Sequence, residues 1–204
     1  MYVVDSDSSV RHALCRLISS VGLELRAFDT ARDFLQWQRP DVPSCLILDV
    51  RLNDLNGLDL QSQLTDARIH IPIIFITAYG DVFMSVRAMK AGAVDFLTKP
   101  YRDQDVLGAI HLALERDRVQ RGRDAEVNDL RRRFGSLTRR ERDVITLVAS
   151  GAPNKHIANR LGVSENTVKA HRKRAMDKME ARSLPELVKL IERLDLPPAL
   201  RDTG

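Results

Sequence analysis

Five short apolar runs recur at nearly regular intervals in the first half of the chain, and they constrain the fold more than any other feature. The runs are YVV (2–4), LELRAF (23–28), CLIL (45–48), IPIIFI (71–76) and AVDFL (93–97). Between them, apolar residues follow the i, i+3, i+4, i+7 spacing of amphipathic helices. These helices are indicated by Val10, Ala13, Leu14, Leu17, Ile18 and Val21, and by residues 30–38, 57–67 and 81–91. The alternation predicts an α/β fold, a doubly wound five-stranded parallel sheet with helices on both faces.

Polar side chains stand directly after four of the predicted strands. In chain order they are Asp5, Ser6 and Asp7, then Asp49, then Thr77, then Lys99 with Pro100. Ligands bind such sheets at the carboxyl ends of the strands, so we expect these groups to converge. Clustered carboxylates suit Mg²⁺, a carboxylate can attack phosphorus, and a lysine with a hydroxyl can hold phosphoryl oxygens. Taken singly, each residue is better explained as a helix cap or a turn; their order along the chain favours a site.

The stretches VVD (3–5), LDVRL around Asp49, FITAYGD after the fourth strand and AMKAGAVDFLTKP through the fifth extend this pattern. Residues 2–120 resemble the receiver domain of two-component response regulators, and the last two stretches are similar to FixJ-type regulators. The resemblance implies that a sensor histidine kinase phosphorylates Asp49. It places Mg²⁺ beside Asp5, Asp49 and the backbone carbonyl of Arg51.

The same resemblance assigns roles to residues of the fourth and fifth strands. It implies that Thr77 hydrogen-bonds the phosphoryl group and that Lys99 pairs with it. It also implies that Phe96 is the aromatic that swings inward when the threonine moves, and that the Lys99–Pro100 peptide bond is cis, as in the family. Receivers of this family pair through one face, here Val82–Leu97, which implies a homodimer.

Three positions depart from the family pattern. Ser6 stands where the family has a second acidic metal ligand, Asn53 where it commonly has proline, and Phe83 where FixJ-like chains often have proline. The loss of one carboxylate at Ser6 weakens Mg²⁺ binding unless another group compensates. An alternative is therefore an atypical regulator with a degenerate acidic pocket, which binds DNA independently of Mg²⁺-dependent phosphorylation.

An enzyme hypothesis starts from the opening VVDSDSS (3–9), which resembles the first motif of haloacid-dehalogenase-type phosphatases. In that case Asp5 would be the nucleophile and Asp7 the general acid or base. The hypothesis leaves Asp49 without a role, and only one acid, Asp81, follows the fourth strand, where that family has a pair. We therefore expect a binding protein and not an enzyme.

From Asp103 onward the pattern is helical and has no firm stop before Gly135-Ser136. Val106, Leu107, Ile110 and Ala113 indicate the last receiver helix, whereas the following residues are mostly charged. Gly122 weakens the helix by about 1 kcal/mol relative to Ala. A continuous helix would span about 48 Å at about 1.5 Å per residue. We expect the receiver domain to cover residues 1–117 and a linker helix 118–135; a solvated charged linker is favoured over a coiled coil.

The charge changes sign between the halves. Residues 1–120 carry 13 Lys and Arg against 16 Asp and Glu, a net charge of −3, whereas residues 121–204 carry 19 against 12, a net charge of +7. A basic half is typical of a nucleic-acid-binding domain, although a basic face is often merely solvated. Aromatic residues make up only 5% of the chain, which does not favour base stacking on single strands.

Helix start and stop signals divide residues 136–204 into a small all-α domain of four helices. Thr138 and Glu141 form a capping box, and Gly151-Ala152-Pro153 ends that helix. Asn154 is expected to cap a short second helix, Gly162-Val163 to form a tight turn, and Ser164 to cap the third helix. A short helix, a glycine-containing turn and a second helix are typical of a helix-turn-helix.

The string LTRRERDVITLVASGAPNKHIANRLGVSENTVKAHRKRAMDKM closely resembles the LuxR-type DNA-binding domain. By that resemblance, residues 164–179 form the recognition helix in the major groove of double-stranded DNA. We expect Lys169, Ala170 and Lys173 to approach base edges. The candidates for phosphate contacts are Lys155, Thr167, His171, Arg172, Arg174 and Lys178. For His171 a bond to neighbouring backbone is an equal alternative, and an interaction protein without DNA binding is an alternative for the whole domain.

Composition excludes some other classes. No apolar run approaches the roughly 20 residues that span a bilayer, so no membrane segment is expected. Two lone cysteines, Cys15 and Cys45, match no metal or redox spacing and suggest a reducing compartment. Together these features predict a cytoplasmic, DNA-binding transcription regulator.

Overall fold

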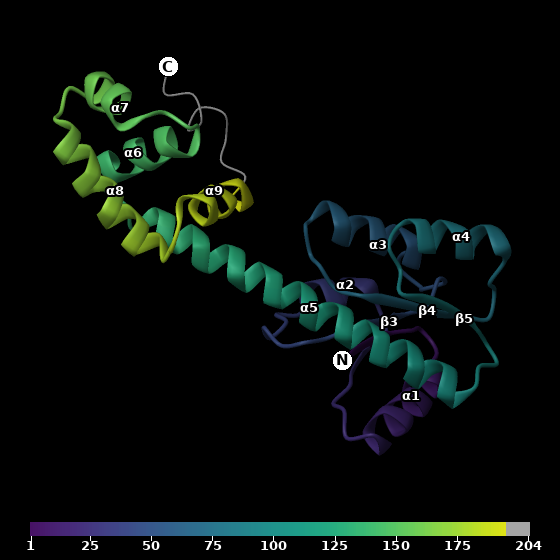
Figure 1. Ribbon diagram of the computed structural model, residues 1–204. Coiled ribbons are helices and arrows are strands. Elements are labelled where there is room, and N and C mark those ends of the chain that lie inside the picture. Colours follow the sequence, from purple (N-terminus) through teal and green to yellow (C-terminus); the bar gives the residue numbers. More distant parts are fainter. Residues whose placement is uncertain (195–204) are drawn as a thin grey trace. The chain divides into compact units, whose positions relative to one another are not determined.

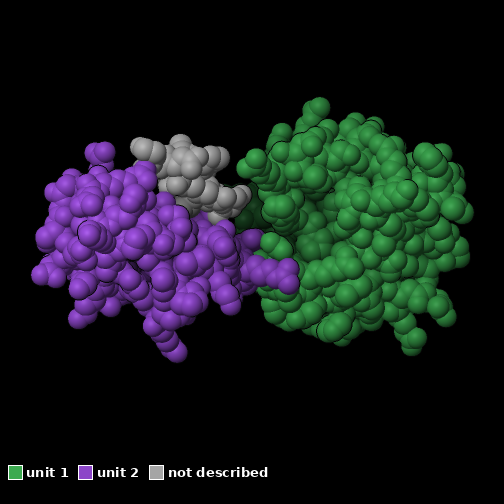
Figure 2. Space-filling model, turned by 45° about the horizontal axis from the view of Figure 1, so that its top comes forward, with its two compact units in different colours: residues 1–121 green, residues 122–204 purple. Residues whose placement is uncertain are grey.

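The computed structural model describes residues 1–194 of the chain. It divides into two compact units, residues 1–121 and the residues from 122 onward (Figure 2). The boundary lies inside one long helix, and each unit has cores of its own. The predicted DNA-binding domain extends to residue 204, and its part after residue 194 lies outside the described residues.

The first unit contains a five-stranded parallel sheet in the order β2-β1-β3-β4-β5 (Figure 1). The strands are β1 (Tyr2–Val4), β2 (Arg26–Phe28), β3 (Leu46–Leu48), β4 (Ile73–Thr77) and β5 (Asp95–Thr98). The order places β3, which ends at the predicted phosphoacceptor, in the centre of the sheet. The doubly wound parallel fold predicted from the apolar runs is confirmed.

Five helices cover this sheet: α1 (Ser8–Ser20), α2 (Ala31–Gln36), α3 (Gly57–Asp66), α4 (Val82–Lys90) and the first part of α5 (Asp103–Gly135). Successive strand residues point to opposite faces, so each strand supplies two cores. Ile47 belongs to the core beneath α1 and α5, whereas Leu46 and Leu48 belong to the core beneath α2, α3 and α4. Figure 1 shows α1 and α5 on one side of the sheet.

Four of the five observed strands are shorter than the apolar runs that predicted them, whereas β1 matches its run. β2 begins at Arg26. Leu23 and Leu25, which belong to the predicted run, pack against the core beneath α1 and α5 but lie outside the paired strand. β4 begins at Ile73, after Pro72, which has no N–H to donate to the ladder. A run of apolar residues indicates that these residues are buried, whereas a β-strand also requires backbone hydrogen bonds to a neighbouring strand.

Helix α5 is continuous over 33 residues, as the helical pattern predicted, and passes through Gly122 without a break. Val106, Ile110 and Ala113 near its start are buried in the core of the first unit. Leu130 and Phe134 near its end are buried in a core of the second unit. The charged stretch between these anchors is helical, so the linker is a helix with an exposed charged surface.

The second unit adds the helices α6 (Arg139–Ala149), α7 (Asn154–Leu161), α8 (Glu165–Met179) and α9 (Leu184–Arg193). The capping box of Thr138 and Glu141 and the cap by Ser164, which accepts from the Thr167 N–H, are confirmed. Gly162 ends α7 at a φ of 64°, a conformation that glycine adopts at low cost. The turn between α7 and α8 is therefore that of a helix-turn-helix.

The predicted cap by Asn154 is wrong. Asn154 is the first residue of α7, and Pro153 occupies the N-cap position without a side-chain hydrogen bond. The Pro153 carbonyl instead accepts the N–H groups of His156 and Ile157. Proline has no side-chain acceptor, so α7 begins without a side-chain cap.

Candidate functional site

The carboxyl ends of β1, β3 and β5 bring two carboxylates and one ammonium group into contact. Lys99 Nζ donates to Asp5 Oδ2 at 2.7 Å and to Asp49 Oδ2 at 2.9 Å. The side chains of Asp5, Asp49 and Lys99 are 3%, 12% and 17% exposed. The structure therefore brings Asp5, Asp49 and Lys99 together, and we call these three residues the acidic pocket.

Burial and ion pairing shift the pKa values of Asp5 and Lys99 in opposite directions. Burial raises the pKa of Asp5 above its ordinary value, although the hydrogen bond from Lys99 and the amide of Asp7 act in the opposite direction. Burial alone would lower the pKa of Lys99, but its hydrogen bonds to Asp5 and Asp49 outweigh burial and raise it. Lys99 therefore stays cationic and neutralises part of the negative charge that the two aspartates bring together.

The backbone around Asp49 is tightly held. Its N–H donates to the Val4 carbonyl at 2.9 Å, and its Oδ1 accepts the Arg51 N–H at 3.1 Å. Gly57, the first residue of α3, leaves no room for a side chain, because an added Cβ would lie 2.3 Å from the Asp49 carbonyl oxygen. In the sequence, Gly57 stands out only as a glycine at the start of a predicted helix, which does not indicate its contact with Asp49.

Thr77 and Phe96 lie on neighbouring strands. Thr77 is fully buried, and its Oγ1 accepts the Tyr79 N–H at 3.3 Å. Phe96 is half-buried with its ring centroid 5.9 Å from that of Phe75. An added Cβ at Gly80 would lie 2.8 Å from the Phe96 ring, so the glycine makes room for this ring position.

The backbone at the end of β5 brings Lys99 to the pocket. The Lys99 N–H donates to the Thr77 carbonyl at 2.8 Å, which joins β5 to β4. The predicted cis Lys99–Pro100 bond is confirmed.

Ser6 links two loops above the pocket. Its Oγ accepts the Asn53 N–H at 3.0 Å, so the hydroxyl ties the segment after β1 to the segment after β3. Asp7 caps α1 by accepting the Ser9 N–H at 2.8 Å, and its carboxylate is engaged there. Among the described residues, no group of three or more His, Cys, Asp or Glu is placed to hold a metal ion.

The oxygen donors that remain are the carboxylates of Asp5 and Asp49 and the carbonyl of Arg51. Oxygen donors of this kind suit Mg²⁺, so the residues fit the ion with one carboxylate fewer than the family pattern.

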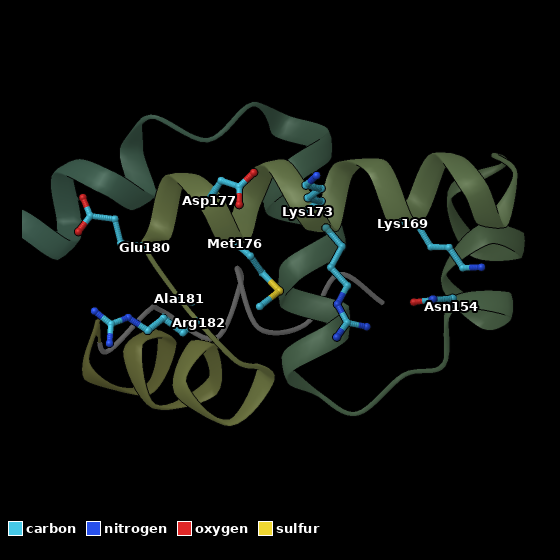
Figure 3. A pocket seen from close by; sticks show the side chains of 9 residues that line it. Asn154, Lys169, Lys173, Met176, Asp177, Glu180, Ala181 and Arg182 are labelled. Carbon is cyan, nitrogen blue, oxygen red and sulfur yellow. The ribbon is translucent and has the colours of Figure 1, made fainter.

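The second candidate site lies on helix α8. Lys169, Ala170 and Lys173 are exposed along one side of this helix. Lys169 and Lys173, together with Arg172 and Met176, line an open surface pocket of about 770 Å³, and Asn154 at the start of α7 lies at one end of it, near Lys169 (Figure 3). A basic helix that projects lysines from a rigid helix-turn-helix is suited to reading base edges in a major groove.

The residues predicted to contact phosphates occupy different environments. Lys155 and Arg174 are exposed, Arg172 is half-buried, and Thr167 Oγ1 is hydrogen-bonded to Ser164 Oγ at 2.9 Å. His171 Nδ1 is buried and has no hydrogen-bond partner in the described part of the chain. In the described residues, Nδ1 of His171 therefore makes no bond to neighbouring backbone.

Lys178 has a partner inside its own unit. Its Nζ donates to Glu141 Oε2 at 2.7 Å and to the Ser136 carbonyl at 3.3 Å. The hydrogen bond from Lys178, with that from the Thr138 N–H, holds the pKa of Glu141 below its ordinary value. Lys178 thus joins α8 to the capping box of α6, and this placement favours a structural role over a phosphate contact.

A parallel α/β unit with two aspartates and a lysine at its strand ends, followed by a helix-turn-helix, defines a DNA-binding signalling regulator. The family described as "Response regulator receiver domain" matches residues 1–111, and that described as "Bacterial regulatory proteins, luxR family" matches residues 135–191. The chain belongs to the response regulators that combine a receiver domain with a LuxR-family DNA-binding domain. The phosphatase hypothesis, with Asp5 as nucleophile, is therefore wrong.

Named relatives match nearly the whole chain. "Nodulation protein W" of Bradyrhizobium diazoefficiens is 52% identical over 196 residues, which are 96% of this chain and 86% of the relative. "Transcriptional regulatory protein FixJ" of Rhizobium meliloti is 41% identical over 191 residues, 93% of each chain. The solved structure of the response regulator StyR is 46% identical with a TM-score of 0.82, covering 94% of this chain and 97% of that one. In the described residues, no helix is long and apolar enough to cross a membrane.

Proposed function

We propose that this response regulator is switched by phosphorylation of Asp49 from a sensor histidine kinase, and that phosphorylation promotes dimerisation and promoter binding. The observation that carries the proposal is the contact of Lys99 Nζ with both Asp5 and Asp49 at the strand ends. Asp49 retains some exposure, so a phosphoryl donor can reach it, whereas Asp5 is buried behind it.

The chemistry follows from this arrangement. An Asp49 carboxylate oxygen attacks the phosphorus of a phosphohistidine, an O–P bond forms, the P–N bond breaks, and the imidazole takes up a proton. Lys99, which now bridges two carboxylates, turns its ammonium toward an oxygen of the incoming phosphoryl group. Bound Mg²⁺ supplies positive charge that offsets repulsion between the carboxylates and the phosphoryl oxygens. Asp5, Asp49 and the Arg51 carbonyl would hold this ion.

The change at Asp49 reaches the surface through Thr77 and Phe96. The Thr77 hydroxyl turns to donate its O–H to a phosphoryl oxygen, and Phe96 follows it inward from its half-buried position. The face Val82–Leu97 then becomes the homodimer interface. In support, Val82 and Phe83 are 80% and 77% exposed, and Val86 and Met89 on the same helix are also exposed. Exposed apolar side chains gathered on one helix mark an interaction site.

A dimer places two copies of α8 on double-stranded DNA. Lys169, Ala170 and Lys173 contact base edges in two half-sites about one helical turn apart. Phosphates are contacted by Lys155, Thr167, His171, Arg172 and Arg174, which set the register without specifying sequence. The protein acts as a cytoplasmic transcription regulator, and the phosphoryl transfer serves the switch rather than metabolic turnover.

A second candidate function rests on Ser6. Its hydroxyl is engaged with the Asn53 N–H, and it brings no negative charge to the pocket. In this alternative the acidic pocket is degenerate, and the regulator binds DNA independently of Mg²⁺-dependent phosphorylation.

The mass of the intact protein after incubation with acetyl phosphate and Mg²⁺ tests these candidates. One added phosphoryl group on the wild type and none on Asp49→Asn is the result expected of the switch. A folded wild type without an adduct, which Ser6→Asp converts into a phosphorylated protein, supports the degenerate pocket instead. Titration of a fluorescent duplex with Lys169→Ala/Lys173→Ala checks the DNA interface, because affinity should fall when both lysines are removed.

A further inference from the structure

Asp117 is a buried carboxylate outside the acidic pocket, and the proposed phosphoryl transfer does not use it. It lies on α5 one turn beyond Ala113. Residues four apart on a helix share a side, so Asp117 continues the stripe of Val106, Ile110 and Ala113 that faces the core. The core-facing side of α5 thus changes from apolar to ionic where the helix reaches the edge of the receiver unit.

The carboxylate of Asp117 fastens a loop to this helix. Its Oδ2 accepts the Ser44 N–H at 2.8 Å and Arg121 Nε at 2.7 Å. Arg121 also pairs with Asp41 in the same loop. Ser44 is buried, so its N–H depends on Asp117 for a hydrogen-bond partner. We call Asp117, Arg121, Asp41 and Ser44 the rim clip.

The rim clip ends next to a glycine in the middle of α5. Arg121 is the last residue of the first compact unit, and Gly122 follows it directly. Glycine lowers the stability of a helix interior relative to alanine. The next fully buried α5 side chain in the described part of the chain is that of Leu130. A short helical stretch with little tertiary burial is only marginally stable in water, so its order depends on its anchors. These are the rim clip, the buried Leu130, and the ion pair of Glu126 with Arg193 of α9.

We propose that the rim clip is a conformational device that holds α5 in helical form up to Arg121, with Gly122 as the hinge that opens when the clip is released. One short strand joins the clip to the phosphoacceptor, because Ser44 lies before the amino end of β3 and Asp49 lies directly after its carboxyl end. A displacement of β3 on phosphorylation acts on the hydrogen bond between Ser44 and Asp117. This regulatory step rests on the proposed function, whereas the clip itself does not.

Hydrogen exchange of the full chain, followed by mass spectrometry, tests the clip. Asp117→Ala and Arg121→Ala should each raise the exchange rate of peptides covering residues 114–125 at least tenfold. Arg118→Ala is the matched control, because it removes the exposed pair of Arg118 with Glu115 on the same helix and leaves the clip intact. The control should change these rates less than twofold, and Gly122→Ala should slow them.

The proposal is overturned if a folded Arg121→Ala chain exchanges residues 114–125 at the wild-type rate. It is also overturned if Arg121→Ala and the control Arg118→Ala change that rate equally. If Asp117→Ala does not fold, Arg121→Ala and Gly122→Ala provide the test. Unchanged exchange in peptides that cover β4 shows that a variant is folded. Coupling is tested on a wild-type sample whose mass proves phosphorylation. Faster exchange over residues 114–125 supports coupling, and unchanged exchange overturns it. A sample that takes no phosphoryl group counts against the proposed function and leaves the clip result standing.

Discussion

Replacing Lys178 by alanine separates a structural role from a contact with DNA. Lys178 lies on the predicted recognition helix and carries a charge that suits a phosphate. In the structure its ammonium group meets the buried Glu141, whose side chain is only 4% exposed. A phosphate contact would affect DNA binding alone, whereas a structural contact contributes to the free energy of unfolding of the second unit.

The magnitude follows from the hydrogen bonds that the substitution removes. A hydrogen bond to a charged group contributes about 1.5–3 kcal/mol, and loss of one partner of a buried ion pair costs about 3–5 kcal/mol. Lys178 is 37% exposed and Glu141 keeps the Thr138 N–H, so the lower range applies. We expect a loss of about 2 kcal/mol, which at a slope of about 2 kcal/mol/M moves the urea midpoint by about 1 M.

Two signals report the two units separately. Trp37 is the single tryptophan of the chain and lies in the first unit, so its fluorescence follows that unit. Circular dichroism follows the helices of both units. In Lys178→Ala, part of the dichroism transition should move to lower urea while the fluorescence transition stays in place. An unchanged midpoint, combined with a slope of DNA affinity against salt reduced by about one, would refute the structural role.

The same pair predicts a dependence on pH. Lys178 lowers the pKa of Glu141 from its ordinary value of 4.5, so the folded state favours the ionised carboxyl. Stability from such a group is complete above its unfolded pKa and is lost as pH falls through the lowered folded pKa. The difference in midpoint between wild type and Lys178→Ala should be full at neutral pH and shrink as the pH falls below 4.5. A difference that grows in acid would contradict the pairing.

Three further predictions follow from single residues. Gly57→Ala should destabilise the first unit by at least about 1–3 kcal/mol in the Trp37-monitored unfolding and reduce phosphorylation of Asp49, because the new Cβ meets the Asp49 carbonyl; a stable, normally phosphorylated variant contradicts this. Burial raises the pKa of Cys45 to about 12, so iodoacetamide at neutral pH should modify the half-exposed Cys15 alone until urea is added, as peptide masses will show. Arg174→Ala should weaken binding to all duplexes alike and lower the salt slope by about one, measured by anisotropy; a loss confined to one sequence would instead indicate base readout.

Local patterns predicted those parts of the structure that depend on few neighbours. The capping box of Thr138 and Glu141 and the cap by Ser164 are contacts between residues three apart, and both are confirmed. The apolar runs predicted the sheet because burial on both faces requires apolar side chains throughout a strand. The cap by Asn154 was wrong because a polar residue near a helix start can occupy the first helical position when proline precedes it.

Contacts between distant segments needed the tertiary structure. Nothing near Ser6 in the chain indicates that its hydroxyl bonds the Asn53 N–H, and nothing near Lys178 indicates Glu141 as its partner. The sequence shows that Lys178 carries a charge, but the direction in which its side chain points depends on how α8 packs against α6. A charged side chain on a helix reaches solvent, DNA or a neighbouring helix according to that packing.

The sequence by itself determined the class of each unit and the order of the residues that meet at the strand ends, because parallel strands deliver their carboxyl ends to one edge. It also determined that the second helix of the helix-turn-helix, α8, is basic. Only the tertiary structure decided which charges are paired within the fold. It placed Lys99 between Asp5 and Asp49, and Asp117 against the Ser44 N–H. Such pairs join residues far apart in the chain, and their geometry exists only once both cores have formed.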